Sequence, residues 1–363
     1  RDRFYTTGTT GMPKGVYFSH RQLVLHTLGA LAAVGTPATQ GRVHQQDVYM
    51  PITPMFHVHA WGMPYVATAL GIKQVYPGRY APELLLRLIE KEYVTFSHCV
   101  PTILHMLLSN PDIGKIDLSN WKVIDGGAAK PQSLCLAALK LGIDIFTGYG
   151  MSETCPVVAL AHVPEDYLDL PLEDQVEVRC KTGRPMPLVG MKLVDDQMHE
   201  VPIDGESTGE IVLRAPWLTQ GYLKDHHNSE NLWRGGFLHT GDVANCDDSG
   251  YFKITDRAKD VIKIAGEWVS SLEVEDILVQ HETVIEAAVI GMPDEKWGER
   301  PLALVVAGES APTEKELVAF VKGFVDSGRL TRHALMLKIL VVEEIAKTSV
   351  GKIDKKLLRQ QHL

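Results

Sequence analysis

The feature that most constrains the fold is an alternation of short β-rich runs with helical patterns between residues 16 and about 160. Strands that alternate with helices form α/β sheets with crossover connections. Three of the helical patterns begin at prolines, which the first turn of a helix tolerates. We therefore expect an α/β domain with strands near 47–51, 94–97, 122–124 and 143–146, and helices that start at Pro82, Pro101 and Pro131.

The pattern changes after residue 175. Short strands and turns then run to about residue 255, which indicates a β-rich subdomain. A charged stretch follows at 255–260, and after it comes a compact α+β pattern. The clearest elements are strands at 209–214, 250–254, 284–290, 302–306 and 338–342, and helices at 272–280 and 314–325.

A chain of 363 residues exceeds what one hydrophobic core usually organises. We expect a large N-terminal domain over 1–256, built from mixed α/β layers and the β-rich subdomain. A hinge joins it to a small α+β C-terminal domain over 257–363.

Polar or glycine-rich segments follow three of the expected strands, at Thr53–His57, Gly126–Ala128 and Thr147–Gly150. In open α/β folds, ligands bind beyond the carboxyl ends of the strands. We therefore expect these three loops to line one site.

Charge excludes one class of partner. Thirty-six Lys and Arg against 45 Asp and Glu give a net charge of −9, whereas a general nucleic-acid binder carries a basic surface. Bases gather only in the tail, which could hold a polyphosphate or be an ordinary solvated helix face. These bases are Lys347, Lys352, Lys355, Lys356 and Arg359.

Cysteine use and hydropathy indicate the compartment. The five cysteines include no CxxC pair, which is typical of reduced thiols, so we expect a cytoplasmic protein. No apolar run approaches the ~20 residues that span a bilayer, so no transmembrane segment is expected. Because the chain starts without Met and reaches a functional loop within a few residues, we also expect an N-terminal portion that is missing here.

That loop, Tyr5–Gly15, combines glycines, four threonines and one lysine. Glycines let backbone amides turn toward an anion, while hydroxyls and a cation add further donors, which favours a phosphate cradle over a simple hairpin turn. It is not a Walker loop, because Pro13 precedes the lysine and Gly15 follows it. The residues expected to bind ATP here are Thr6, Thr7, Gly8, Thr9, Thr10 and Lys14.

The same loop resembles the signature of the acyl-adenylate-forming superfamily of AMP-binding enzymes. This superfamily includes acyl-CoA synthetases, luciferases and peptide-synthetase adenylation domains. Further motifs resemble the family's in the family's order, and the resemblance covers the whole chain. They are Gly126–Ala128, Tyr149–Thr154, His239–Asp242, Asp256–Lys259 and Lys347–Lys352.

The resemblance implies how the nucleotide is bound. Gly127 and Ala128 line the adenine pocket and Tyr149 stacks on adenine, with Gly150 and Ser152 in the same motif. Asp242 accepts the ribose hydroxyls, and Arg257 also lies at the nucleotide. Without that context, Asp242 reads equally as a turn aspartate before a strand.

The resemblance also implies the charges that act on the reacting groups. Glu153 and Thr10 would hold Mg²⁺, which prefers hard oxygen ligands, and Lys352 would be the catalytic lysine. The plainer alternative makes Glu153 and Lys352 ordinary solvated surface residues.

A thiol acceptor is implied by the C-terminal motifs. In the family, the small domain rotates about a hinge that Lys259 matches, and Gly266 matches a glycine that lets pantetheine pass. Lys263 lies between these two positions and is assigned with them to CoA binding and the hinge. The segment 266–271 resembles fatty acyl-CoA ligases, which favours CoA as the acceptor.

The segment Pro54–Pro64 is the best indication of the acid. Trp61 resembles the gate tryptophan of long-chain fatty acyl-CoA synthetases, with His57 four residues earlier as a catalytic candidate and Gly126 as the other acyl-pocket residue. Similar His and Trp positions occur in ligases for short acids such as 3-methylthiopropionate. Trp61 could also be an ordinary core aromatic.

Together these motifs imply an ATP-dependent acyl-CoA synthetase that forms AMP and activates a medium- or long-chain fatty acid through an acyl-adenylate. ATP, Mg²⁺ and CoA are the expected cofactors, and the expected partners are small-molecule substrates; a homodimer is left open. The alternatives are a short-acid CoA ligase, an adenylating enzyme with a carrier protein or oxygen as acceptor, and a truncated non-catalytic paralogue that binds nucleotide.

Overall fold

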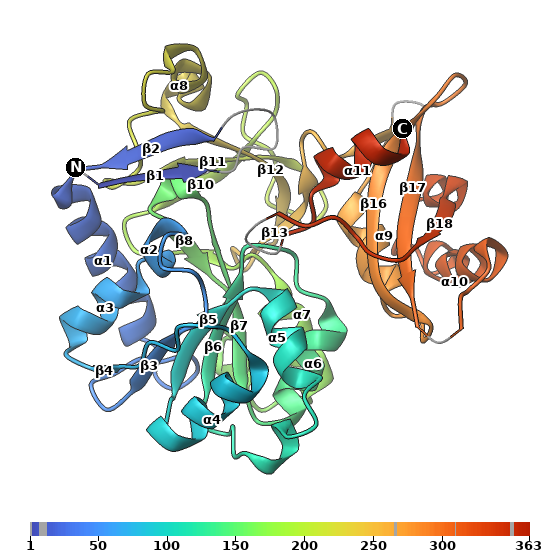
Figure 1. Cartoon of the computed structure of the whole chain (residues 1–363). Helices are drawn as coiled ribbons and strands as arrows, with labels where there is room; N and C mark the ends of the chain where they lie inside the picture. Colours follow the sequence, from blue (N-terminus) through green and yellow to red (C-terminus); the bar gives the residue numbers. More distant parts are fainter. Residues whose placement is uncertain (1, 7–12, 265–266, 309, 349–351) are drawn as a thin grey trace. The chain divides into compact units, whose positions relative to one another are not determined.

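A computed structural model of the chain describes residues 2–6, 13–264, 267–308, 310–348 and 352–363. The chain divides into two compact units. The first contains residues 1–240 and 245–253, and the second contains residues 241–244 and 254–363. Figure 1 labels most of the helices and strands of each unit.

A seven-stranded sheet in the order β4-β3-β5-β6-β7-β8-β9 forms the centre of the first unit (Figure 1). Its first five strands are parallel, and β8 and β9 run antiparallel to their neighbours. The strands are β3 (Val48–Pro51), β4 (Lys73–Gln74), β5 (Phe96–Cys99), β6 (Lys122–Gly126), β7 (Asp144–Gly150), β8 (Val157–Leu160) and β9 (Arg184–Pro185). The four strands expected in this region correspond to β3, β5, β6 and β7.

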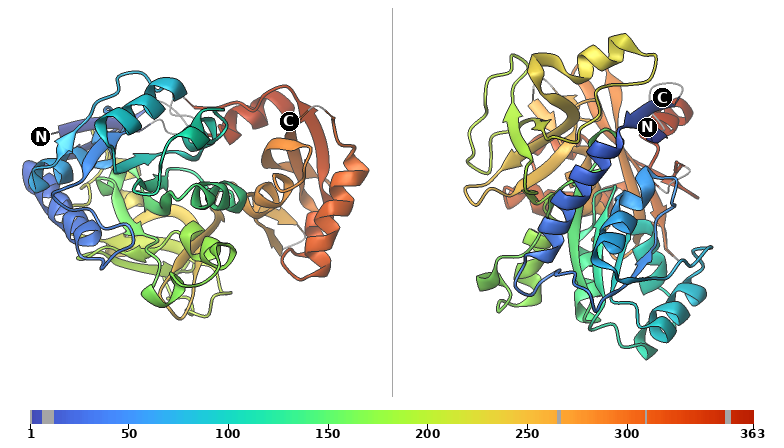
Figure 2. Two further views of the ribbon diagram at one scale, coloured as in Figure 1. Left: turned by 90° about the horizontal axis from the view of Figure 1, so that it is seen from below. Right: turned by 90° about the vertical axis from the view of Figure 1, so that its left-hand side faces the viewer.

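Helices flank this sheet. One face packs against α4 (Pro82–Glu92), α5 (Pro101–Leu108), α6 (Gln132–Lys140) and α7 (Leu172–Cys180) in a shared apolar core. α1 (His20–Gly35) and α3 (Met63–Leu70) contact each other on the other side of the sheet (Figures 1 and 2). The proline rule is confirmed, because α4 and α5 begin at their prolines and α6 begins one residue after Pro131.

Two further antiparallel sheets are formed by strands that precede residue 258. β1 (Asp2–Thr6) and β2 (Lys14–Phe18) form a hairpin. A four-stranded sheet has the order β10 (Gly190–Val194), β11 (Gly209–Arg214), β12 (Leu238–Cys246), β13 (Phe252–Arg257). The strand expected at 209–214 is confirmed as β11, whereas α7 and α8 (His226–Leu232) lie in a region where the sequence predicts only strands and turns.

The second unit has an antiparallel sheet in the order β15-β14-β17-β16, to which β18 adds in parallel beside β17. Its strands are β14 (Ile262–Ile264), β15 (Glu267–Val269), β16 (Val284–Asp294), β17 (Gly298–Ala307) and β18 (Lys338–Val342), and its helices are α9 (Ser271–Leu278), α10 (Glu314–Asp326) and α11 (Lys355–His362). The helices expected near 272–280 and 314–325 are therefore present as α9 and α10. β14 and β15 were not predicted, whereas α11 lies in the basic tail, for which a helix face was one of the two interpretations.

The basic tail is largely neutralised by acids of the same unit. Lys347 Nζ lies 3.0 Å from Glu286 Oε1, Lys355 Nζ lies 2.7 Å from Glu275 Oε1, and Arg359 Nη2 lies 2.8 Å from Asp260 Oδ1. Three of the five bases thus have carboxylate partners, so the tail as a whole is not an open polyphosphate patch. Throughout the described part of the chain, no helix combines the length and the apolar character needed to cross a membrane.

Candidate functional site

Lys14 lies at the end of the β1–β2 hairpin that is joined by the expected phosphate loop. It pairs with Thr6 across the two strands, and its ammonium group lies 4.7 Å from the centre of the Tyr222 ring. A cation over an aromatic face is electrostatically attracted to the ring. Four residues predicted to bind phosphate, Thr7, Gly8, Thr9 and Thr10, fall outside the described residues.

Glu153 is buried, with 6% of its surface exposed, in the 3₁₀ helix η2 (Ser152–Thr154). The Tyr222 hydroxyl donates to Glu153 Oε1 at 2.6 Å, and β1 contacts the same 3₁₀ helix. Burial, together with the Glu153 charge, raises the pKa of Tyr222 well above its usual range, so the phenol remains a donor. The structure therefore links Lys14, Tyr222 and Glu153, and the alternative of a solvated Glu153 is wrong.

Tyr222 is a residue that the sequence did not single out. It lies 69 residues after Glu153 in the chain, and no motif around it indicates that it belongs to a polar site. Its backbone pairs with Val16 of β2 in an isolated bridge. This bridge, together with the contact between Lys14 and the ring, places Tyr222 near the loop end of the hairpin.

The glutamate carboxylate fits a magnesium ion better than a metal that needs a full protein cage. Among the described residues, no three His, Cys, Asp or Glu side chains gather as a metal site. Mg²⁺ usually takes one or two carboxylates and completes its shell with waters and substrate phosphates. A single buried carboxylate beside the hairpin whose loop is expected to bind phosphate is compatible with that donor set.

The segment expected as a loop at Thr147–Gly150 is instead the end of strand β7. Tyr149 is almost fully buried there, and Ser152 begins the following 3₁₀ helix. A Cβ at Gly150 would lie 2.0 Å from the carbonyl oxygen of Pro156, so only glycine fits. This close approach sets the path of the chain from Tyr149 to Glu153.

Gly126 ends strand β6 and pairs with Gly148 of β7. A Cβ at Gly126 would lie 2.3 Å from the Gly148 carbonyl oxygen and 3.3 Å from the Trp61 ring. The chain then turns at Gly127, whose φ is +81°, and exposes Ala128. The structure thus places Trp61 beside Gly126, the two residues predicted to line an acyl pocket.

Trp61 lies at the end of a left-handed backbone turn. The turn α2 (Val58–Trp61) follows His57, and its four residues have φ between +47° and +59°. Left-handed helical geometry costs roughly 1–2 kcal/mol per non-glycine residue. Trp61 is nevertheless buried, with 5% of its surface exposed.

The indole of Trp61 stacks on the imidazole of His98, with ring centres 4.9 Å apart and planes 30° apart. His98 lies on β5 and is fully buried. Its Nε2 is 2.7 Å from the Tyr49 hydroxyl and its Nδ1 is 2.7 Å from the Thr53 hydroxyl. Burial, with a smaller effect of His57, lowers the pKa of His98 to about 3, so the ring is neutral. The sequence did not single out His98.

The remaining predicted residues lie in the second unit. Arg257 Nε is 3.2 Å from Asp242 Oδ1. Burial, and then the nearby Arg257 charge, lowers the pKa of Lys259. Lys263 Nζ lies 5.6 Å from the centre of the Trp268 ring.

Lys352 lies in the same unit and contacts Thr348. Its backbone amide donates to Thr348 Oγ1 at 3.2 Å, and its carbonyl accepts from the Thr348 amide at 2.7 Å. Gly266, the predicted pantetheine glycine, falls outside the described residues.

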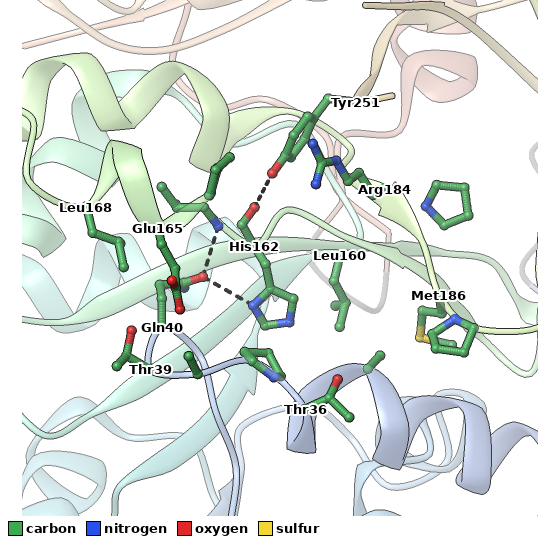
Figure 3. A pocket seen from close by; sticks show the side chains of 17 residues that line it. Thr36, Thr39, Gln40, Leu160, His162, Glu165, Leu168, Arg184, Met186 and Tyr251 are labelled. Carbon is green, nitrogen blue, oxygen red and sulfur yellow. Dashed lines mark hydrogen bonds between the residues drawn. The ribbon is translucent and has the colours of Figure 1, made fainter. Parts of the chain in front are cut away.

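A cavity of about 370 Å³ opens elsewhere on the first unit (Figure 3). His162 lies at its centre, where Gln40 Oε1 accepts from His162 Nδ1 and from the Val163 amide (Figure 3). Arg184 lies over the ring of Tyr251 at its rim. None of the sequence-predicted residues that the structure describes lines this cavity, so it is separate from the Lys14, Glu153 and Trp61 surroundings.

Comparisons with known proteins agree with the resemblance. The chain is 42% identical over 363 residues to a long-chain-fatty-acid–CoA ligase of Thermus thermophilus, covering 99% of this chain and 65% of the relative. It is 39% identical over 366 residues to a 3-methylmercaptopropionyl-CoA ligase of Ruegeria lacuscaerulensis, covering 98% of this chain and 65% of that relative. The chain thus spans about two thirds of the length of these relatives.

The fold is also that of solved adenylate-forming enzymes. The structure of the anthranilate CoA ligase AuaEII in complex with anthranoyl-AMP superposes with a TM-score of 0.82 at 27% identity, covering 99% of this chain and 66% of that one. This likeness confirms the expected α/β architecture with a smaller C-terminal part. The AMP-binding enzyme family model matches residues 4–223, and the model of its C-terminal domain matches residues 273–352. The chain therefore belongs to the AMP-binding enzyme family.

Proposed function

We propose that the full-length protein is an ATP-dependent, AMP-forming acyl-CoA synthetase, an acid–thiol ligase. The observation that carries this proposal is the link from Lys14 through Tyr222 to Glu153. It places a cation and a buried carboxylate beside the hairpin whose loop resembles the family's phosphate loop. A nucleoside triphosphate bound with Mg²⁺ needs a cation near its phosphates and a carboxylate near the metal ion.

In the proposed first step, a carboxylate oxygen of the acid attacks the α-phosphorus of ATP, and pyrophosphate leaves. Two anions must approach one another, so electrostatic stabilisation dominates. Lys14 and the threonine loop would hold the leaving pyrophosphate. Glu153, with Thr10, would hold Mg²⁺, which neutralises phosphate charge. Lys352 would stabilise the charge shared by the acid and the adenylate.

In the proposed second step, the CoA thiol attacks the acyl carbonyl and AMP leaves. Asp242 and Arg257 would stay with the ribose, while Tyr149, Gly150, Ser152, Gly127 and Ala128 surround the adenine. We further propose that residues 257–363 act as a mobile domain that turns at Lys259, with Lys263 and Gly266 along the pantetheine path. The five free cysteines support a reducing, cytoplasmic setting.

For the acid, we favour a medium- or long-chain fatty acid, with Trp61 and Gly126 lining its pocket and His57 close to the reacting carboxylate. The similarity to the Thermus ligase supports this choice. A short acid such as 3-methylthiopropionate is the second candidate. It is supported by the similarity to the Ruegeria ligase and by the burial of Trp61 against Gly126.

The test is to incubate the full-length protein with ATP, Mg²⁺, CoA and acids from three to eighteen carbons. AMP, pyrophosphate and an acyl-CoA are the expected products. Cleavage of ATP to ADP would contradict the assignment. Acyl-AMP without thioester would indicate another acceptor, and nucleotide binding without any turnover would indicate a non-catalytic paralogue.

A further inference from the structure

Trp61 occupies a position that its own backbone does not favour. Four successive residues, Val58–Trp61, have positive φ, and valine, alanine and tryptophan all disfavour that region. Such strained conformations persist only where the surrounding structure holds them. The contacts of the indole ring must therefore do part of this work.

The ring stacks on His98, whose orientation is itself fixed. Both imidazole nitrogens have a hydroxyl within hydrogen-bond distance, Tyr49 at Nε2 and Thr53 at Nδ1. One nitrogen of a neutral imidazole donates and the other accepts, so two hydroxyl partners satisfy the ring completely. All four side chains, including that of Trp61, are buried. The imidazole face is thus a rigid platform.

The Trp61 ring also lies over the end of strand β6. It approaches to 3.3 Å from the point where a Cβ of Gly126 would stand. Because Gly126 has no side chain, the indole can lie this close to the strand end. An acyl chain that passes this strand end would therefore meet the indole.

We propose that His98 is the positioning residue that holds Trp61 over Gly126 and thereby limits the length of the aliphatic acid that is accepted. The proposal rests on the proposed function for its substrate class, but the platform itself is a property of the fold. His98 needs no contact with the acid, because it acts through the indole. Tyr49 acts one step further out by fixing the imidazole.

The test compares full-length wild type with His98→Ala and Tyr49→Phe. The first removes the platform, and the second removes one hydroxyl partner but leaves every ring in place. We expect the ratio of kcat/KM for a sixteen-carbon acid to that for an eight-carbon acid to rise about tenfold in His98→Ala, and to rise less in Tyr49→Phe. In a Trp61→Ala background, His98→Ala should shift this ratio no further, because the residue through which it acts is gone. His105→Ala, which removes an exposed histidine of the neighbouring helix α5, is the matched control.

A second measurement does not depend on turnover. In protein labelled with 5-fluorotryptophan, the ¹⁹F resonance that Trp61→Phe removes should be sharp in wild type and should shift or broaden in both platform variants but not in His105→Ala. If no acid is activated yet this resonance responds, the proposed function fails and the platform stands. If acids are activated and neither the resonance nor the chain-length ratio changes in folded Tyr49→Phe and His98→Ala, the proposal is overturned.

Discussion

The hydroxyl of Tyr222 donates a 2.6 Å hydrogen bond to Oε1 of Glu153, while the face of the same ring carries the ammonium group of Lys14. One side chain therefore orders both charges that the proposed reaction would need at the phosphates. The burial that raises the Tyr222 pKa keeps the phenol protonated, so the donor remains in place across the range of ordinary assays.

Tyr222→Phe should lower kcat/KM for ATP by about tenfold, because hydrogen bonds to charged groups are worth about 1.5–3 kcal/mol. The ring under Lys14 is retained, so the loss reports on the Glu153 contact. Initial rates at varied ATP and Mg²⁺ measure it. Tyr167→Phe, at a partly exposed tyrosine of the same unit, should change nothing; equal ATP kinetics in both variants would refute the role of Tyr222.

Lys352→Ala should reduce adenylation by about a hundredfold or more, the scale found when a donor to developing charge is removed. Acid-dependent exchange of pyrophosphate into ATP measures this step alone. Lys356→Ala, an exposed lysine four residues further on, is the matched control. A comparable loss in both variants would point to the charge of the tail rather than to Lys352.

Asp242→Ala should weaken ATP binding about tenfold or more, since a charged acceptor is lost and Arg257 loses a carboxylate 3.2 Å away. Calorimetric titration with ATP and with its deoxyribose analogues checks the cause. Wild type should discriminate against the deoxy forms and Asp242→Ala should not. Asp248→Ala, at an exposed aspartate nearby in the sequence, should retain full affinity and discrimination.

Stability should fall as the pH drops from about 6.5 toward 4. Burial lowers the pKa of His26 to about 4, that of His98 to about 3 and that of His162 to about 4. The unfolded chain, with an ordinary pKa near 6.5, binds these protons more tightly than the folded one does. Each histidine therefore removes about 2 kcal/mol of unfolding free energy at pH 5 relative to pH 8.

Denaturant unfolding of wild type and His26→Gln at pH 8 and pH 5 checks this sign. The variant is expected to lose about 2 kcal/mol less than wild type on acidification, whatever its stability at pH 8. His105→Gln, which changes an exposed histidine, should lose as much as wild type. A wild-type stability that rises on acidification would contradict the assignment of these histidines as neutral.

Gly126→Ala should destabilise the first unit by about 1–3 kcal/mol through overpacking, because the new methyl group would meet the Gly148 carbonyl oxygen at 2.3 Å. The midpoint temperature of thermal unfolding and the turnover rate should both decline. Gly323→Ala in helix α10 is the control, since nothing lies within 4 Å of its Cβ position. It should be neutral or slightly stabilising.

The parts that the sequence predicts well are those fixed by local chemistry. Pro82 and Pro101 mark helix starts because a first-turn proline loses no helical hydrogen bond, and the strand at 209–214 follows from its apolar pattern. Trp61 and Gly126 could be paired in advance because both belong to motifs of a recognisable family. The role of each remains a prediction.

The parts that the sequence misses depend on distant contacts. Tyr222 meets Glu153 across 69 residues, and His98 meets Thr53 across 45, so no local pattern signals either pair. The two interpretations of the five-base tail stayed open for the same reason, because the acids that neutralise Lys355 and Arg359 lie far away in the chain. The extension of β7 to Gly150 likewise depends on pairing with its neighbours rather than on its glycines.

The division of the chain has a consequence for anyone who wishes to express its halves separately. Residues 241–244 group with the second unit, yet residues 245–253, which follow them, group with the first. The polypeptide therefore passes from one unit to the other three times, and no single cut yields both halves whole. A fragment that starts at 257 would leave behind Asp242, the carboxylate partner of Arg257. A simple truncation would thus separate two charged side chains that belong to the same unit.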